Sequence, residues 1–183
     1  MKKRIIIIAL VLIQLAVPAW MIVAQEHILK NGDLVKFKTA PVDPYDIFRG
    51  RYVALSTDQR SIRVKNVKDF RSGQDLYVIF ETDAEGFAQA VDVRLQRPHH
   101  NQYIKTSVQY ASGDLVHFNL PLNRYYMNEE NAPLAQGIYR DNSRQNKQDA
   151  FMKVRVLNGK ALIEGLYVGG KRLESFFEEE SGL

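Results

Sequence analysis

The first pattern along the chain is an uninterrupted apolar stretch near its N-terminus. Residues 5–24 contain no charged side chain and are dominated by isoleucine, leucine, valine and alanine. A helix of this length rises about 30 Å, which matches the hydrocarbon thickness of a bilayer. The stretch therefore predicts one transmembrane helix, with Trp20 near one interface, and the lipid bilayer as a binding partner of the chain.

Three basic residues, Lys2, Lys3 and Arg4, precede this stretch. Basic residues favour the cytoplasmic side, so we expect residues 1–4 in the cytoplasm and residues 25–183 outside it, at the periplasmic face of an inner or cytoplasmic membrane. A cleaved signal peptide, cut after Ala19 or Ala24, is the alternative. Both interpretations deliver the domain to the same side, and the length of the apolar run favours a retained signal anchor.

Beyond residue 24 the dominant pattern is an alternation of apolar and polar residues with a period of two, which is typical of half-buried β-strands. An alternation of apolar and polar residues at 91–95 follows an apolar run at 76–80, and residues 83–86 between them have the composition of a turn. This arrangement predicts a β-hairpin. The clearest single strand has a less polar face made of Ile104, Thr106, Val108 and Tyr110.

Another hairpin is predicted near the C-terminus. Apolar residues alternate from Met152 to Val156, and a mostly apolar run returns at 161–168. Between them lies Asn158-Gly159, the pair that a tight type I′ turn prefers. Only residues 131–150 lack strand character, which predicts a loop with a short helix. The fold class expected is therefore mainly β, an antiparallel sandwich or barrel-like sheet with one short helix or loop excursion, preceded by one transmembrane helix.

The most unusual stretch lies at residues 41–56, PVDPYDIFRGRYVALS. Pro41 and Pro44 fix the backbone and withhold two donors, so a rigid, exposed corner is expected, with Asp43 extended before Pro44. An ion pair between Asp43 and Arg49 would stabilise this corner, and an anion site formed by Arg49 and Arg51 is the alternative. Beyond Gly50, the residues from Tyr52 onward alternate as a new strand.

This stretch resembles a family of bacterial membrane-anchored proteins named after its motif, G-D-Y-x-x-L-x-Y, which is preceded by a P-x-D-P segment and an R-G dipeptide. Two positions depart from the motif: Arg51 stands where aspartate gives the family its name, and the last tyrosine of the motif is absent. A second family feature is an R-Y-F/Y segment followed by acidic residues, here Arg124-Tyr125-Tyr126 with Glu129 and Glu130. The motif positions that match are Pro41, Asp43, Pro44, Phe48, Arg49, Gly50, Tyr52 and Leu55.

The resemblance implies a membrane-anchored protein without an established activity. Family members tend to be encoded beside multi-pass membrane proteins, which implies an integral membrane protein as partner. It also marks the residues of a possible binding site. These are Pro41, Asp43, Pro44, Arg49, Gly50, Tyr52, Leu55, Arg124, Tyr125, Tyr126 and Glu129.

The composition and the motifs that are absent from the sequence exclude several kinds of catalytic and metal site. The chain has no cysteine, which excludes disulfides, thiolate metal sites and cysteine nucleophiles. It also lacks a G-x-S-x-G elbow, an S-x-x-K pair and an H-E-x-x-H motif. We therefore name no catalytic residue, no metal ligand and no cofactor, and we expect a non-enzymatic protein.

The formal net charge is +4, and Lys2, Lys3 and Arg4 supply three of these charges. The remainder of the chain is nearly neutral, so the charge argues for membrane orientation and against a nucleic-acid partner. The basic residues that do cluster, at 60–71, fit a solvated edge strand, with anionic lipid headgroups as the alternative ligand.

Two functions remain open at this point. The first is a non-enzymatic interaction module that works with a polytopic membrane partner. The second is a ligand-binding or hydrolytic envelope domain with its site around Asp43, Arg49, Tyr52 and residues 124–126.

Overall fold

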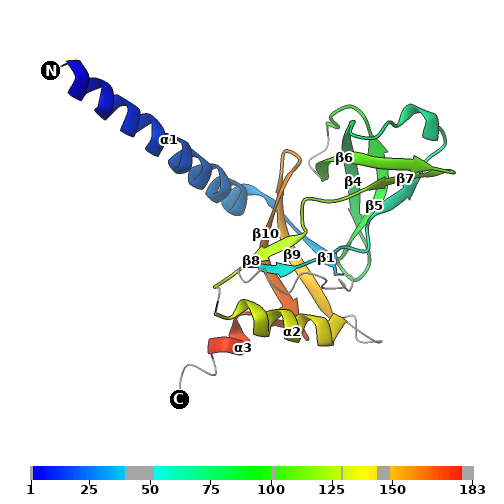
Figure 1. The fold of residues 1–183 in the computed structure, drawn as a ribbon. Coiled ribbons are helices and arrows are strands. Elements are labelled where there is room, and N and C mark those ends of the chain that lie inside the picture. The colour runs from blue at the N-terminus through cyan, green and yellow to red at the C-terminus, as the bar shows by residue number, and fades with distance from the viewer. Residues whose placement is uncertain (1, 40–51, 100–101, 129, 144–148, 179–183) are drawn as a thin grey trace.

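A computed structural model describes residues 2–39, 52–99, 102–128, 130–143 and 149–178. The apolar N-terminal stretch forms the first part of one long helix, α1 (Lys2–Asn31), which projects away from a β-rich body (Figure 1). In the described part of the chain, this is the one helix long and apolar enough to cross a membrane. Its candidate span is Leu10–Asn31. The helix continues seven residues past the end of the apolar stretch at Ala24, which carries it into the β domain.

The helix passes into the first strand through Gly32 alone. The Gly32 amide donates to the Ile28 carbonyl over 2.8 Å, and the Gly32 carbonyl accepts from Arg155 Nη1 over 3.1 Å. A Cβ atom at Gly32 would lie 2.6 Å from the Ile28 carbonyl oxygen and 3.1 Å from the Val156 nitrogen. The close approach leaves no room for a side chain, so helix and sheet are joined without a flexible linker.

The helix leads into a four-stranded antiparallel sheet of β1 (Asp33–Lys38), β9 (Ala150–Leu157), β10 (Lys160–Val168) and β11 (Lys171–Arg172), in the order β1-β9-β10-β11. Asn158 and Gly159 have φ values of 51° and 81° between β9 and β10. Positive φ at both positions is the requirement of a type I′ turn, so the predicted C-terminal hairpin is confirmed.

A second sheet has five antiparallel strands in the order β3-β7-β6-β4-β5, with a short 3₁₀-helix, η1 (Val67–Asp69), between β3 and β4. The predicted hairpin at 76–95 is its β4–β5 pair. The basic cluster begins at an edge of this sheet, on the strand β3, where Arg63 pairs with Asp114. The strands are β3 (Ser61–Arg63), β4 (Asp75–Thr82), β5 (Ala88–Arg94), β6 (Tyr103–Ser112) and β7 (Leu115–Phe118).

Two bulges change which residues face the core. The β6–β7 register shifts between Val108 and Tyr110, so Val108 is buried whereas Tyr110 is 53% exposed and stacks on His117. The β4–β5 register shifts beside Val91, which is also exposed. The expected common faces of these strands are therefore wrong beyond the bulges, because an inserted residue reverses the alternation.

The remaining elements are a two-stranded ribbon of β2 (Tyr52–Ala54) and β8 (Arg124–Tyr126) and two helices, α2 (Ala132–Ser143) and α3 (Ser175–Glu178). The helix predicted within residues 131–150 is confirmed as α2. One core joins all of these elements, and the rings of Phe37 on β1 and Phe80 on β4 meet edge to face at 5.1 Å within it. Its fully buried members include Val53, Leu76, Ile104, Phe118, Met152 and Leu166.

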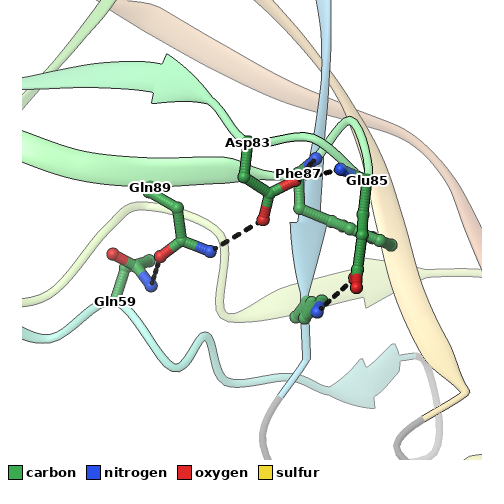
Figure 2. A network of polar contacts seen from close by, with 6 residues as sticks. Gln59, Asp83, Glu85, Phe87 and Gln89 are labelled. Atoms are coloured by element: carbon green, nitrogen blue, oxygen red, sulfur yellow. Dashed lines mark hydrogen bonds and ion pairs between the residues drawn. The ribbon is translucent and has the colours of Figure 1, made fainter.

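A polar network connects the two edges of the five-stranded sheet, the segment just before β3 and the strand β5 (Figure 2). Gln59 lies just before β3, and its side chain accepts from the Ala90 amide on β5 over 2.9 Å. It also donates to the Gln89 side chain over 3.0 Å, which donates in turn to Asp83 over 3.3 Å. These side chains satisfy groups at the β5 edge, so the sheet is nearly closed, as the barrel-like prediction requires.

The same network ties the second sheet to the first. Asp83 accepts from the amides of Phe87 and Glu85, each over 2.9 Å, and these bonds, that of Phe87 foremost, lower the pKa of its carboxyl group. Lys38 of β1 pairs with Glu85 over 2.8 Å, and its ammonium group lies 4.8 Å from the centre of the Phe87 ring. The β4–β5 turn is thus fixed against β1.

The helix–sheet junction yields a stability prediction. We expect Gly32→Ala to lower the free energy of unfolding by about 1–3 kcal/mol, because the added methyl group must displace backbone atoms. The measurement is thermal unfolding of the full chain in mild detergent. The matched control is Gly137→Ala in α2, where a Cβ meets nothing within 4 Å. That change should raise stability by about 0.5–1 kcal/mol through helix propensity, and an equal response of both variants would contradict the prediction.

Candidate functional site

The structure brings together the two motif segments that the sequence separates. Strand β2 pairs with β8 so that Tyr52 faces Tyr126, Val53 faces Tyr125 and Ala54 faces Arg124. The pairing continues at Leu55, whose amide donates to the Asn123 carbonyl over 3.0 Å. The described part of the first motif, from Tyr52 to Leu55, and the second motif therefore form one β-ribbon.

The outer side of this ribbon presents what we call the Tyr-Arg face, made of Tyr52, Arg124 and Tyr126. The rings of Tyr52 and Tyr126 meet edge to face, with centroids 5.7 Å apart. The guanidinium carbon of Arg124 lies 5.1 Å from the centre of the Tyr52 ring, a cation–π distance. Tyr126 is 66% exposed, so an aromatic and cationic surface faces outward.

The inner side of the ribbon is structural. Val53, Leu55 and Tyr125 are buried there, and the Tyr125 hydroxyl donates to Glu174, which lies just before α3. Glu174 also accepts from Arg172 over 3.1 Å. Burial, and then the hydrogen bond to Glu174, raise the pKa of Tyr125 to about 12. Of the three consecutive residues predicted at 124–126, Arg124 and Tyr126 are exposed, and Tyr125 between them fastens the ribbon to the C-terminal segment.

Helix α2 covers the other edge of β2. The side-chain oxygen of Gln136 accepts from the Ala54 amide over 2.9 Å, while Ala135 and Tyr139 are buried beside it. Within the described part of the chain, the Gln136 amide nitrogen is buried without a hydrogen-bond partner. Gln136 supports the ribbon, but no sequence pattern singled it out, because its partner is a backbone amide far away in the chain.

A pocket of about 250 Å³ opens beside Leu55. Arg60 is its cation, and the Arg60 guanidinium donates to the Thr57 carbonyl over 3.2 Å and to the Ser56 hydroxyl. None of the described residues that line the pocket is acidic, so its chemistry suits a small anionic or hydroxylated molecule. The lining consists of Leu55, Ser56, Thr57, Arg60, Asn119, Leu120, Leu122 and Asn123.

Several predicted residues lie outside the described residues, namely Pro41, Asp43, Pro44, Arg49, Gly50 and Glu129. Thr39, before residues 40–51, and Thr57, after them, both lie in the described part of the chain. Thr39 and Thr57, both buried, form an isolated antiparallel bridge, and the Thr39 hydroxyl donates to the Ala150 carbonyl over 2.8 Å. Counted from Gly50, Thr57 occupies the last position of the family motif. In this chain the residue at that position forms the backbone bridge to Thr39.

The described residues of the ribbon bring together groups that make non-covalent contacts. Among all the described residues, no group of three or more histidine, aspartate or glutamate side chains is arranged to hold a metal ion. The groups that converge on the ribbon are aromatic rings, a guanidinium and amides. These groups recognise partners by stacking, cation–π contact and hydrogen bonding.

The Tyr125 contact predicts a pH dependence. Since the folded-state pKa of Tyr125 is raised above the unfolded value of about 10, its contribution to stability is fully present below pH 10 and is lost as the pH rises toward 12. We expect Tyr125→Phe to cost about 1.5–3 kcal/mol at neutral pH, the range for hydrogen bonds to charged groups. The difference from the native chain should shrink between pH 10 and 12.

Denaturant unfolding at a series of pH values measures this difference. Tyr110→Phe, at an exposed ring, controls for the loss of a phenol at the surface. A Tyr125→Phe variant as stable as the native chain at neutral pH would show that the contact to Glu174 carries no net stability.

Comparison with known proteins identifies the family of the chain. The family that matches is described as GDYXXLXY protein, and the match spans residues 14–166. Comparisons with curated proteins and with solved structures give no significant match. The matched segment contains both strands of the ribbon, the five-stranded sheet and most of the β9–β10 hairpin. The chain therefore belongs to the GDYXXLXY protein family.

Proposed function

We propose that this protein is a single-pass, membrane-anchored interaction module whose extracytoplasmic domain binds a polytopic membrane protein through the Tyr-Arg face. Lys2, Lys3 and Arg4 before the apolar stretch support a cytoplasmic N-terminus and a domain on the periplasmic side of the inner membrane. Helix α1 continues through the possible cleavage sites to Asn31 and joins β1 at Gly32 without a linker. Both features support a permanent anchor.

The Tyr-Arg face carries this proposal. Tyrosine and arginine are enriched at protein interfaces and among residues whose truncation weakens binding, whereas surfaces without partners rarely gather them. Here the face is built on backbone pairing, and its underside is fixed by Tyr125 and Gln136. A rigid aromatic surface loses little conformational entropy on binding, which favours affinity.

The junction between helix and sheet supports a membrane-embedded partner. Because Gly32 and Arg155 fix the domain to α1, the domain keeps one height and tilt relative to the bilayer. A partner held in the same bilayer then meets the Tyr-Arg face at a high effective concentration.

Site-specific photocrosslinking in living cells tests this function. A photoreactive residue at position 126 should form an adduct with a multi-pass membrane protein, and the same residue at the exposed position 110 should not. Arg124→Glu should reduce the position-126 adduct at least about five-fold, as expected for an interface residue worth more than about 1 kcal/mol. The proposal fails if position 126 yields no protein adduct, or adducts no more abundant than those of position 110.

The pocket beside Leu55 favours a second candidate function, a ligand-binding envelope domain. Its single guanidinium and its amide and hydroxyl lining suit a carboxylate or phosphate group. Asp43 and Arg49, the residues that the sequence suggested for ligand binding or hydrolysis, lie shortly before β2 in the sequence.

Thermal unfolding with added inorganic phosphate or succinate tests this alternative. Binding at 100 times Kd would stabilise the chain by about 2.7 kcal/mol, and Arg60→Gln should abolish the shift while Lys65→Gln preserves it. The absence of a shift in the native chain, or an equal shift in both variants, would count against a site for these two anions.

A further inference from the structure

A second groove lies between the anchor helix and the turn of the β9–β10 hairpin. Its volume is about 390 Å³, and the hairpin rises beside the C-terminal part of α1 (Figure 1). Ala24 and Ile28, one helical turn apart, are the half-buried residues of α1 that face it. The full lining consists of Trp20, Val23, Ala24, His27, Ile28, Leu157, Asn158 and Lys160.

The hairpin turn is held in place by contacts unrelated to the helix. The Gly159 carbonyl accepts from the Lys105 amide over 2.8 Å, and a Cβ atom at Gly159 would lie 2.6 Å from the Tyr103 ring. Arg97 donates to the Tyr103 hydroxyl over 2.7 Å and to the Asn158 side chain over 3.1 Å. The turn side of the groove is therefore fixed by the β domain itself, and Arg97 holds Asn158, which lines the groove.

The groove combines an apolar floor with a cationic rim. Val23, Ala24, Ile28 and Leu157 supply the apolar atoms, and Lys160 supplies an exposed ammonium group. No described carboxylate pairs with Lys160, and no lining residue is acidic. The nearby acidic residue on α1, Glu26, is paired with Lys30 over 3.0 Å.

Its height matches the headgroup layer of a membrane. Trp20 is 75% exposed, near the end of the apolar stretch, where tryptophan anchors a helix at the interface. Ile28 lies four residues past the end of the apolar stretch at Ala24, which is about 6 Å along the helix axis and within a headgroup layer about 5–8 Å thick. The groove therefore begins at the interface and ends in the layer that phosphate groups occupy.

We propose that this groove binds one anionic phospholipid, with the phosphate at Lys160 and Asn158 and the glycerol and upper acyl chain against Val23, Ala24 and Ile28. The charge of the rim and the small volume favour a lipid over a helix of another protein, which is about 10 Å wide and needs a trough several turns long. The bound lipid would brace the domain against its anchor. This inference rests on the insertion of α1 into a bilayer and is independent of any protein partner.

The experiment uses the purified full chain alone, reconstituted in phosphatidylcholine nanodiscs that contain a trace of a photoactivatable lipid. Photoactivatable phosphatidylglycerol should label peptides that contain residues 20–28 and 157–160 at least about five-fold more than photoactivatable phosphatidylcholine does, since one lysine near a membrane surface contributes about that factor. Equal labelling by both lipids, or labelling elsewhere on the chain, overturns the proposal.

Charge reversal at the rim gives a second readout. Lys160→Glu should remove the preference for phosphatidylglycerol, whereas Lys171→Glu, an exposed lysine beyond the other end of β10, should retain it. Equal thermal stability of the two variants establishes that both are folded. Should crosslinks from the groove in native membranes reach a protein while the purified chain shows no lipid preference, the occupant is a partner helix and the lipid assignment is wrong.

The lipid test and the test of the Tyr-Arg face fail independently. A negative crosslink at position 126 leaves the lipid preference of the purified chain unaffected. Loss of the lipid preference, likewise, leaves the position-126 adduct in cells as a separate observation.

Discussion

The backbone pairing of β9 with β1 and β10 is the constraint on which the other parts of the molecule depend. The buried side chains of β9 form one face of the core, and they are Ala150, Met152, Val154 and Val156. At one end of the strand Arg155 holds the Gly32 carbonyl, and the turn beyond Leu157 lines the groove beside α1. At the other end the Ala150 carbonyl holds Thr39, which precedes the motif segment. One strand therefore links the anchor, the groove and the ribbon.

The ribbon shows how a very short pair of strands becomes a rigid surface. Two strands of three residues each are marginal in isolation, because few hydrogen bonds offset the entropy of ordering them. Here Val53 lies in the core, Tyr125 is fastened to Glu174, and Gln136 satisfies the Ala54 amide at the open edge. The residues Tyr52, Arg124 and Tyr126 lie on the opposite side of the ribbon from these supports.

Much of the fold could be predicted from local patterns. The apolar stretch at 5–24, the turn at Asn158-Gly159 and the hairpin at 76–95 each follow from residues close in sequence, and each is found in the structure. The faces of β5 and β6 could not be predicted, because a bulge depends on the register of the partner strand. For the same reason Tyr110, expected on the less polar face, is exposed.

The sequence by itself determined the membrane-crossing potential of the N-terminus, the mainly β class and the family, since these depend on composition, period and motif. It also marked both segments of the candidate site, although not that Tyr52 would face Tyr126. Only the tertiary structure decided that pairing, the support from Gln136 and Glu174, and the groove between α1 and the β9–β10 turn. Each of these joins residues far apart in the chain, and such contacts are set by the packing of a shared core, which no local pattern encodes.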